Sequence, residues 1–222
     1  MFHVKHHLPD IQISYRNVSR ETFRAINELS EKNGEYLDRY ISRLLWWNKT
    51  VNLVSRNATV ESVRNHVNHS LFPSILPTFT ESGVVLDAGS GGGLPGFPLA
   101  ICFPEKKVVL NDISSKKTTV LSRLKSELNV VNASISSESV DGFIASNPNI
   151  DCIVSKHAFK ISDILNKASC GNWSHIVLLK GDDFKNELSD IPYPVTIDTY
   201  PLGDGTDLSF YTGKMMLDIQ RI

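Results

Sequence analysis

The residues with the clearest chemical potential lie in one short stretch, residues 84–96, which reads VVLDAGSGGGLPG. Five glycines and one proline fall within ten of these residues, directly after a short apolar run. Glycine costs about 0.5–1 kcal/mol relative to alanine inside a regular element. A glycine turn between a strand and a helix lets a ligand approach bare backbone and presents helix N–H groups to it. A purely structural turn needs fewer glycines, so the stretch predicts a ligand site.

Two classes of ligand fit this turn. Gly91, Gly93 and Gly96 satisfy G-x-G-x-x-G, the pattern of dinucleotide-binding enzymes. Gly89, Gly91 and Gly93 satisfy D-x-G-x-G-x-G counted from Asp87, the pattern of adenosylmethionine-dependent methyltransferases. The second is favoured, because Gly89 follows the strand almost at once and because Asp87 is badly placed beside a pyrophosphate. A carboxylate there suits a cationic ligand, or loop amides that need an acceptor.

A second carboxylate supports an adenosyl ligand. Asp112 follows the next predicted strand, 23 residues after Gly89. At that position it can accept hydrogen bonds from both ribose hydroxyls of an adenosine or of a nicotinamide nucleotide, so it does not separate the two classes. No Gly-Lys-Ser/Thr follows the turn, which excludes a P-loop.

The composition is that of an ordinary globular protein. The chain has 222 residues, 41% apolar and 21% charged, with a formal net charge of −1, so a globally basic nucleic-acid coat is not indicated. Cys102, Cys152 and Cys170 are scattered without metal-ligand spacing, which predicts free thiols in a reducing cytoplasm. The first residues, MFHVKHHLPD, lack the apolar core of a signal peptide, and no stretch approaches the ~18 apolar residues of a membrane span. We expect a soluble cytoplasmic protein.

The pattern of predicted helices and strands divides the chain into two parts. Helical periodicity begins at Ser19 and breaks at Asn33-Gly34, after which a second helix carries an apolar stripe of Tyr36, Leu37, Tyr40, Ile41, Leu44 and Leu45. A third helical run follows Thr59, a candidate N-cap. After Pro77, apolar strands alternate with helices, which is typical of parallel strands covered on both faces. The predicted strands cover residues 84–87, 106–112, 131–136, 150–155 and 175–181, followed by 194–202 and 208–220.

The predicted fold class is therefore α/β. We expect a Rossmann-like, doubly wound, mostly parallel sheet, with an antiparallel C-terminal pair at one edge. We expect residues 1–77 to form a helical N-terminal extension and residues 78–222 to form the adenosylmethionine-binding domain.

Longer motifs narrow the prediction to a family. WWNKTVNLVSRN, HVNHSL, LDAGSGGGLPGFPLA, NDISSKK and LLKG occupy residues 46–57, 66–71, 86–100, 111–117 and 178–181. In these motifs the chain resembles the RsmG family, also called glucose-inhibited division protein B, which methylates guanine N7 in 16S ribosomal RNA. The Leu-Pro-Gly-x-Pro extension of the turn is much more specific than the glycines alone.

The resemblance implies a site for S-adenosyl-L-methionine. Gly89 and Leu94 match the cofactor positions of the turn, and Asp112 matches the ribose acid. Val140 and Asp141 match the pair that faces the adenine, where Asp141 would accept from the amino group. The remaining candidate cofactor residues are Asp87, Gly91, Gly93 and Lys156.

Three positions depart from the family pattern. Ser139 stands where an arginine is usual, and Ser155-Lys156-His157 replaces Ser-Arg-Ala. Lysine keeps the charge but loses the planar fork of arginine. These departures keep open a catalytically weakened homologue that binds RNA or the ribosome. An NAD(P)-dependent oxidoreductase is the rival from another enzyme class.

The expected chemistry needs few side chains. Guanine N7 is an unprotonated lone pair, so no base has to remove a proton before it attacks a sulfonium methyl. Alignment of the reactants can then suffice. We expect no catalytic side chain, no nucleophilic cysteine and no metal.

The expected partner is 16S rRNA or the small ribosomal subunit, bound by a monomer. Residues 102–125 hold six basic and two acidic side chains, of which Lys116, Lys117 and Arg123 are the candidate RNA contacts. Trp46 and Trp47 could stack on a base, but their helical spacing favours the core. His66 and His69 lack a third metal ligand in the sequence, and we expect them to cap the glycine turn or to hydrogen-bond to it.

Overall fold

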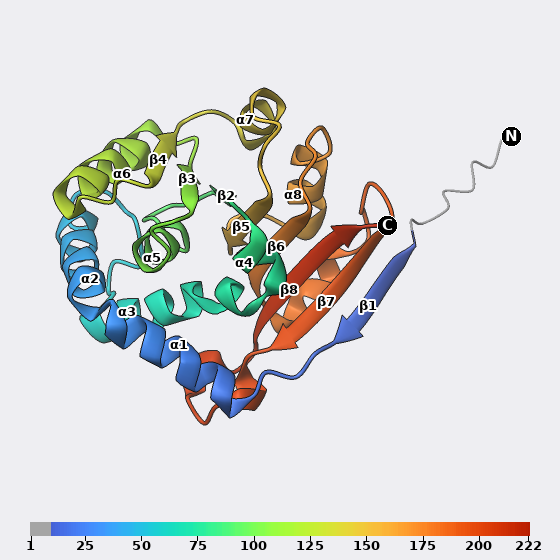
Figure 1. Cartoon of the computed structure of the whole chain (residues 1–222), viewed down its shortest axis with the longest axis horizontal. Helices are drawn as coiled ribbons and strands as arrows, with labels where there is room; N and C mark the ends of the chain where they lie inside the picture. The colour runs from blue at the N-terminus through green and yellow to red at the C-terminus, as the bar shows by residue number, and fades with distance from the viewer. Residues whose placement is uncertain (1–9) are drawn as a thin grey trace, which may run out of the picture.

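The computed structural model describes residues 10–222, which form one eight-stranded sheet in the order β1-β7-β8-β6-β5-β2-β3-β4 (Figure 1). Strand β8 is antiparallel to both neighbours, and every other pair is parallel. The strands are β1 Ile11–Tyr15, β2 Val84–Ala88, β3 Lys107–Asn111, β4 Ala133–Ser136, β5 Cys152–Lys156, β6 His175–Gly181, β7 Val195–Pro201 and β8 Lys214–Arg221.

The strands predicted from the sequence are all present, and the predicted α/β class is confirmed. The bounds agree within two residues except for the predicted segment 208–220, whose strand begins only at Lys214 because residues Ser209–Tyr211 form a 3₁₀ turn. The helices are α1 Arg20–Lys32, α2 Gly34–Asn48, α3 Val60–Ser70, α4 Pro77–Glu81, α5 Gly96–Cys102, α6 Ser115–Leu128, α7 Val140–Ser146 and α8 Ile161–Lys167. Short 3₁₀ turns are η1 Phe72–Ile75, η2 Asp182–Glu187, η3 Gly203–Gly205 and η4 Ser209–Tyr211.

Two predicted helix starts are confirmed by their caps. The Ser19 side chain accepts from the backbone N–H of Thr22 at the start of α1. The Thr59 side chain accepts from the N–H of Ser62, whose own side chain accepts in return from the Thr59 N–H. Such caps satisfy amide groups that the first helical turn leaves without a partner.

The sheet edge differs from expectation. Strand β1 pairs in parallel with β7, with Ile11 opposite Val195, so the C-terminal pair does not form the edge. The five-residue segment IQISY was missed because it is short and buries only part of one face. The predicted division at residue 77 stays a prediction, although residues 11–15 join the sheet. The expectation that the first residues are no signal peptide falls on 1–9, outside the described residues.

Each face of the sheet has its own core. Val85 packs into the core that α1, α2, α3, α5 and α6 cover, whereas its neighbour Leu86 packs into the core of α7 and α8. This alternation follows from the two-residue period of a strand. In Figure 1 helices α1, α2 and α3 curve around α5, with α6 beside α2, so these N-terminal helices help to cover one face of the sheet.

The N-terminal helices also hold the glycine turn. Tyr40 of α2 is fully buried, and its hydroxyl donates to the carbonyl of Gly92 at 3.0 Å. A Cβ at Gly92 would lie 2.9 Å from Leu44 Cδ1 and 3.2 Å from the Leu53 carbonyl oxygen. Asn48 fixes that segment in turn, because its side-chain oxygen accepts from the N–H of Leu53 at 2.8 Å. Residues 40–53 therefore hold the glycine turn in its conformation.

We expect Tyr40→Phe to lower the free energy of unfolding by about 1–3 kcal/mol, because the buried Gly92 carbonyl loses its donor. Urea denaturation measures this difference. Tyr36→Phe is the matched control in the same helix, since the Tyr36 side chain is 52% exposed. Equal effects of the two substitutions would contradict the proposed role of the Tyr40 hydroxyl.

Candidate functional site

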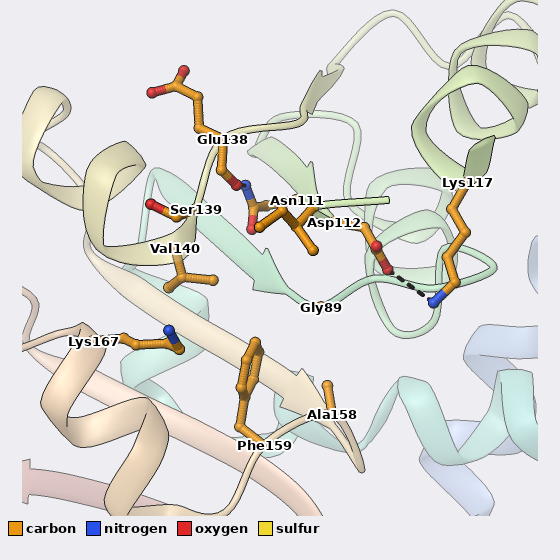
Figure 2. A pocket seen from close by; sticks show the side chains of 11 residues that line it. Gly89, Asn111, Asp112, Lys117, Glu138, Ser139, Val140, Ala158, Phe159 and Lys167 are labelled. Carbon is orange, nitrogen blue, oxygen red and sulfur yellow. Dashed lines mark hydrogen bonds and ion pairs between the residues drawn. The ribbon is translucent and has the colours of Figure 1, made fainter. Parts of the chain in front are cut away.

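A cavity of about 300 Å³ opens where β2, β3, β4 and β5 end, the edge at which open α/β sheets bind ligands (Figure 2). In this view Asp112 and Lys117 meet on one side, while Lys167 lies on the other. The cavity is lined by Gly89, Asn111, Asp112, Ile113, Lys117, Glu138, Ser139, Val140, Ala158, Phe159 and Lys167.

The turn after β2 makes the floor of this cavity. Gly89, Gly91 and Gly93 have φ values of 73°, 57° and 95°, a region that side chains rarely adopt. A Cβ at Gly89 would also lie 2.5 Å from Ala158 Cβ. The three positive-φ glycines are those of the D-x-G-x-G-x-G pattern, whereas Gly96 begins α5. The backbone thus follows the methyltransferase register.

Asp112 is buried and partly satisfied by the protein. Its Oδ2 accepts from the Gly91 N–H at 3.0 Å and lies 3.3 Å from Lys117 Nζ. Its Oδ1 accepts from the Ser114 N–H at 2.9 Å. A carboxylate has about four acceptor positions, so capacity is left for a hydroxyl donor from the cavity. The side chain fits the ribose role implied by the resemblance.

Asp87 lies behind the turn and does not line the cavity. Its Oδ2 accepts from the Gly96 N–H at 2.8 Å, while its Oδ1 is buried with no hydrogen-bond partner among residues 10–222. Burial raises the pKa of this carboxyl to about 7. A cationic ligand at the turn would favour the ionised form. This orphaned oxygen and the glycine floor together fit a ligand such as adenosylmethionine.

The residues after β4 occupy different positions. Val140 is buried and lines the cavity, but Asp141 is exposed, and its Oδ1 lies 3.8 Å from Lys167 Nζ. Ser139, which replaces the arginine of the family, caps α7 by accepting from the Gly142 N–H at 3.2 Å. Glu138 lines the cavity and was missed, because its position shows only once the end of β4 is known.

Lys156 lies outside the lining of the cavity. Its Nζ is 3.0 Å from Nδ1 of His66, and burial together with nearby Lys214 lowers its pKa to about 8. The expectation that His66 and His69 bond the glycine turn is wrong, since Tyr40 fills that role and neither ring nitrogen of His69 has a partner among the described residues.

The remaining turn residue is Leu94, which is buried in the core shared with the N-terminal helices. Across residues 10–222, His, Cys, Asp and Glu side chains form no group of three that could hold a metal ion. Over the same range, no helix is long and apolar enough to span a membrane.

The basic side chains of residues 102–125 do not share one surface in the fold. Lys116 and Arg123 are exposed on α6, whereas Lys117 pairs with Asp112 at the cavity. Lys106 is buried and donates to the carbonyls of Thr80 and Ser82, so it is structural.

The two tryptophans also separate. Trp47 packs against the core, but Trp46 is 49% exposed, and the Arg43 guanidinium lies 4.6 Å from its ring centroid.

The wall opposite β4 is fixed by a network that sequence reasoning did not find. Lys180 Nζ donates to the Phe159 carbonyl at 3.0 Å and to Glu187 Oε1 at 2.7 Å. Glu187 Oε2 accepts from the Ile161 N–H at 2.9 Å. The Leu-Lys-Gly run at the end of β6 was its only signal. The network holds Ala158 and Phe159 against Gly89.

Comparison with known proteins decides the family. The family model described as "GidB: rRNA small subunit methyltransferase G" matches residues 33–199. The chain belongs to this family. A Pseudomonas paraeruginosa protein named "Ribosomal RNA small subunit methyltransferase G" is 35% identical over 184 residues, covering 80% of this chain and 84% of the relative. A Chlorobium limicola protein of the same name is 39% identical over 130 residues, covering 59% of this chain and 57% of the relative.

Solved structures support the same fold. A methyltransferase from Geobacter sulfurreducens superposes with a TM-score of 0.55 at 15% identity, covering 86% of this chain and 96% of that one. The fibrillarin/Nop5p complex gives a TM-score of 0.52 at 17% identity, covering 72% of this chain and 82% of that one. The fold is that of a class I adenosylmethionine-dependent methyltransferase, and the family implies S-adenosyl-L-methionine as cofactor. These findings exclude the alternative of an NAD(P)-dependent oxidoreductase.

We expect Gly89→Ala to weaken binding of S-adenosylhomocysteine by about tenfold, equivalent to about 1.4 kcal/mol. The added Cβ strains a positive-φ residue and displaces Ala158. Isothermal titration calorimetry measures the affinity. Gly34→Ala is the control, because a Cβ there meets nothing within 4 Å. Unchanged affinity in Gly89→Ala would place the cofactor elsewhere.

We expect the stability of the wild type to fall more steeply with pH than that of Asp87→Asn. The raised pKa of Asp87 means that the folded state binds its proton more tightly than the unfolded state does. The free energy of unfolding that this proton contributes is fully present below the pKa of Asp87 in the unfolded chain, which is near 4. It is lost as the pH rises through the pKa of the folded state, about 7. Urea denaturation from pH 4 to 7.5 compares the two proteins.

The control for this comparison is Asp207→Asn, whose carboxylate is 96% exposed. Its pH profile should follow that of the wild type. If Asp87→Asn also follows it, Asp87 does not ionise as its burial implies.

Proposed function

We propose that this protein transfers the methyl group of S-adenosyl-L-methionine to N7 of a guanine in 16S rRNA. The main support is the glycine turn, whose backbone follows the methyltransferase register and opens onto a cavity edged by Asp112. Membership of the rRNA small subunit methyltransferase G family supports the choice of RNA as substrate.

Each cavity residue has a role in this proposal. Asp112 accepts from the ribose hydroxyls, while Val140 and Phe159 provide apolar walls for the adenine. The cofactor supplies the electrophilic methyl group. Asp87 lies behind the turn, where its charge favours a cationic ligand. The protein binds and aligns the reactants, and the guanine N7 lone pair attacks without a base.

The partner and the setting belong to the same proposal. We expect the protein to act as a cytoplasmic monomer on 16S rRNA or on the small ribosomal subunit. Lys116 and Arg123 are exposed on α6, the helix that also contributes Lys117 to the cavity. Their charges would contact RNA phosphates close to the cofactor.

The test is a map of N7-methylguanine in 16S rRNA from cells with and without the gene. We expect one modification to disappear with the gene and to return with the wild-type gene but not with Asp112→Ala. Purified protein should restore the same modification in vitro when S-adenosyl-L-methionine is added. An unchanged map, with the protein still bound to small subunits, would favour a catalytically weakened homologue.

Thermal unfolding provides the matching binding test. S-adenosylhomocysteine should raise the melting temperature of the wild type, since a ligand that binds only the folded state stabilises it. NAD and NADP should leave it unchanged. A shift with either dinucleotide and none with S-adenosylhomocysteine would contradict the proposal.

A further inference from the structure

A group of basic side chains lies beside the cofactor cavity and is not used by the function proposed above. We call it the histidine–lysine cluster. Its members come from α3, from the end of β5 and from the start of β8. They are His66, His69, Lys156, His157 and Lys214.

The cluster adjoins the cavity through one short loop. Lys156 ends β5, and Ala158, two residues later, lines the cavity. The chain turns between them at His157, which has φ of 53° and donates its N–H to the Leu179 carbonyl at 3.1 Å. A non-glycine residue in this region is strained, and such strain gathers at functional sites. Phe159 lines the cavity beyond this turn, whereas Lys156 before it contacts His66.

The positive charge of the cluster is only partly compensated, because Asp87 acts on Lys156 and Asp183 acts on His157 from beyond ion-pair distance. Among residues 10–222, neither Lys156 nor Lys214 forms an ion pair with a carboxylate. Burial, with Lys156 as the next cause, lowers the pKa of both His66 and His157 to about 4. An anion would relieve this mutual repulsion, and both lysines are partly accessible to one.

The hydrogen bonds leave donors free for such an anion. A lysine ammonium can only donate, so the 3.0 Å contact makes His66 Nδ1 the acceptor for Lys156. The proton of neutral His66 is then on Nε2, where it can be donated outward. Lys214 donates to the Phe210 carbonyl and lies 4.0 Å from the Phe210 ring centroid.

His69 provides an independent sign of a site. Its ring is fully buried, and neither nitrogen has a hydrogen-bond partner among the described residues. The ring centroid lies 6.2 Å from that of His157 and 6.1 Å from that of Phe210. Buried polar groups are normally satisfied, and an unsatisfied one costs about 1–3 kcal/mol. The cluster therefore contains a buried imidazole, that of His69, whose ring nitrogens lack a hydrogen-bond partner among the described residues.

We propose that the histidine–lysine cluster binds a backbone phosphate of the target nucleotide and holds its base beside the methyl donor. This inference rests on the proposed function. The cluster offers donors and positive charge, which match phosphate oxygens. The Watson–Crick edge of guanine needs acceptors for its N1–H and N2–H groups, whereas the two lysines of the cluster can only donate. Repulsion from the lysines would also oppose the cationic N7-methylated base.

The first test uses Lys214→Gln, because Lys214 is no part of the cofactor cavity. Binding of 16S rRNA or small subunits and the methylation rate are measured over a range of salt. We expect KM for RNA to rise about tenfold and the slope of log Kd against log salt to fall by about one unit. The affinity for S-adenosylhomocysteine should not change.

The matched controls are Lys214→Arg, which keeps the charge, and Lys107→Gln. Lys107 is exposed at the amino end of β3, the opposite edge of the sheet. Both should retain the wild-type salt slope. The proposal is overturned if Lys214→Gln matches Lys107→Gln. If the wild type itself neither binds S-adenosylhomocysteine nor methylates RNA, the proposed function has failed instead.

A second measurement needs no variant, which matters because Lys214→Gln also loses a bond to Phe210. Ring signals of His66 are followed by NMR in the wild type with S-adenosylhomocysteine bound. Guanosine monophosphate should shift them and raise the pKa of His66, whereas guanosine should not. Equal responses to the two compounds, or none to either, would rule out a phosphate site.

Discussion

The turn after β2 passes through three residues of positive φ, and its first residue packs so closely on the loop after β5 that no Cβ fits between them. Close backbone approach of this kind is only available to glycine. The carboxylates at the two strand ends then hold the turn by its amides, Asp87 through Gly96 and Asp112 through Gly91. The geometry of the cofactor cavity depends on these bonds, because they fix the floor against which every other wall is placed.

The N-terminal helices belong to this arrangement. Tyr40 donates to the Gly92 carbonyl, and the segment that Asn48 orders presses its Leu53 carbonyl against the same glycine. The buried face of the turn therefore contacts the N-terminal helices, and Gly89 on its open face lines the cavity. Residues 40–53, which include most of the motif at 46–57, thus hold the glycine turn against the sheet.

Sequence reasoning found the elements whose signals are local. Apolar runs such as 175–181, the caps at Ser19 and Thr59, and the glycine register each depend on neighbours in the chain. Strand β1 was missed because its stability comes from pairing with β7, far along the sequence. Lys106 was counted as a surface charge because its carbonyl partners lie in another element. Phe159, Glu138 and Lys180 were missed for the same reason.

The structure shows what Ser139, Lys156 and His157, which depart from the family pattern, do in this chain. Ser139 caps α7, a role that an arginine side chain cannot fill. Lys156 and His157 mark the point where one loop divides two environments, the cofactor cavity and the histidine–lysine cluster. Methyl transfer needs a donor and an acceptor held in line, and a shared loop couples the two positions directly. Lys180 and Glu187 hold that loop from outside the cavity, so in the proposed arrangement they would position the donor and the acceptor without touching either.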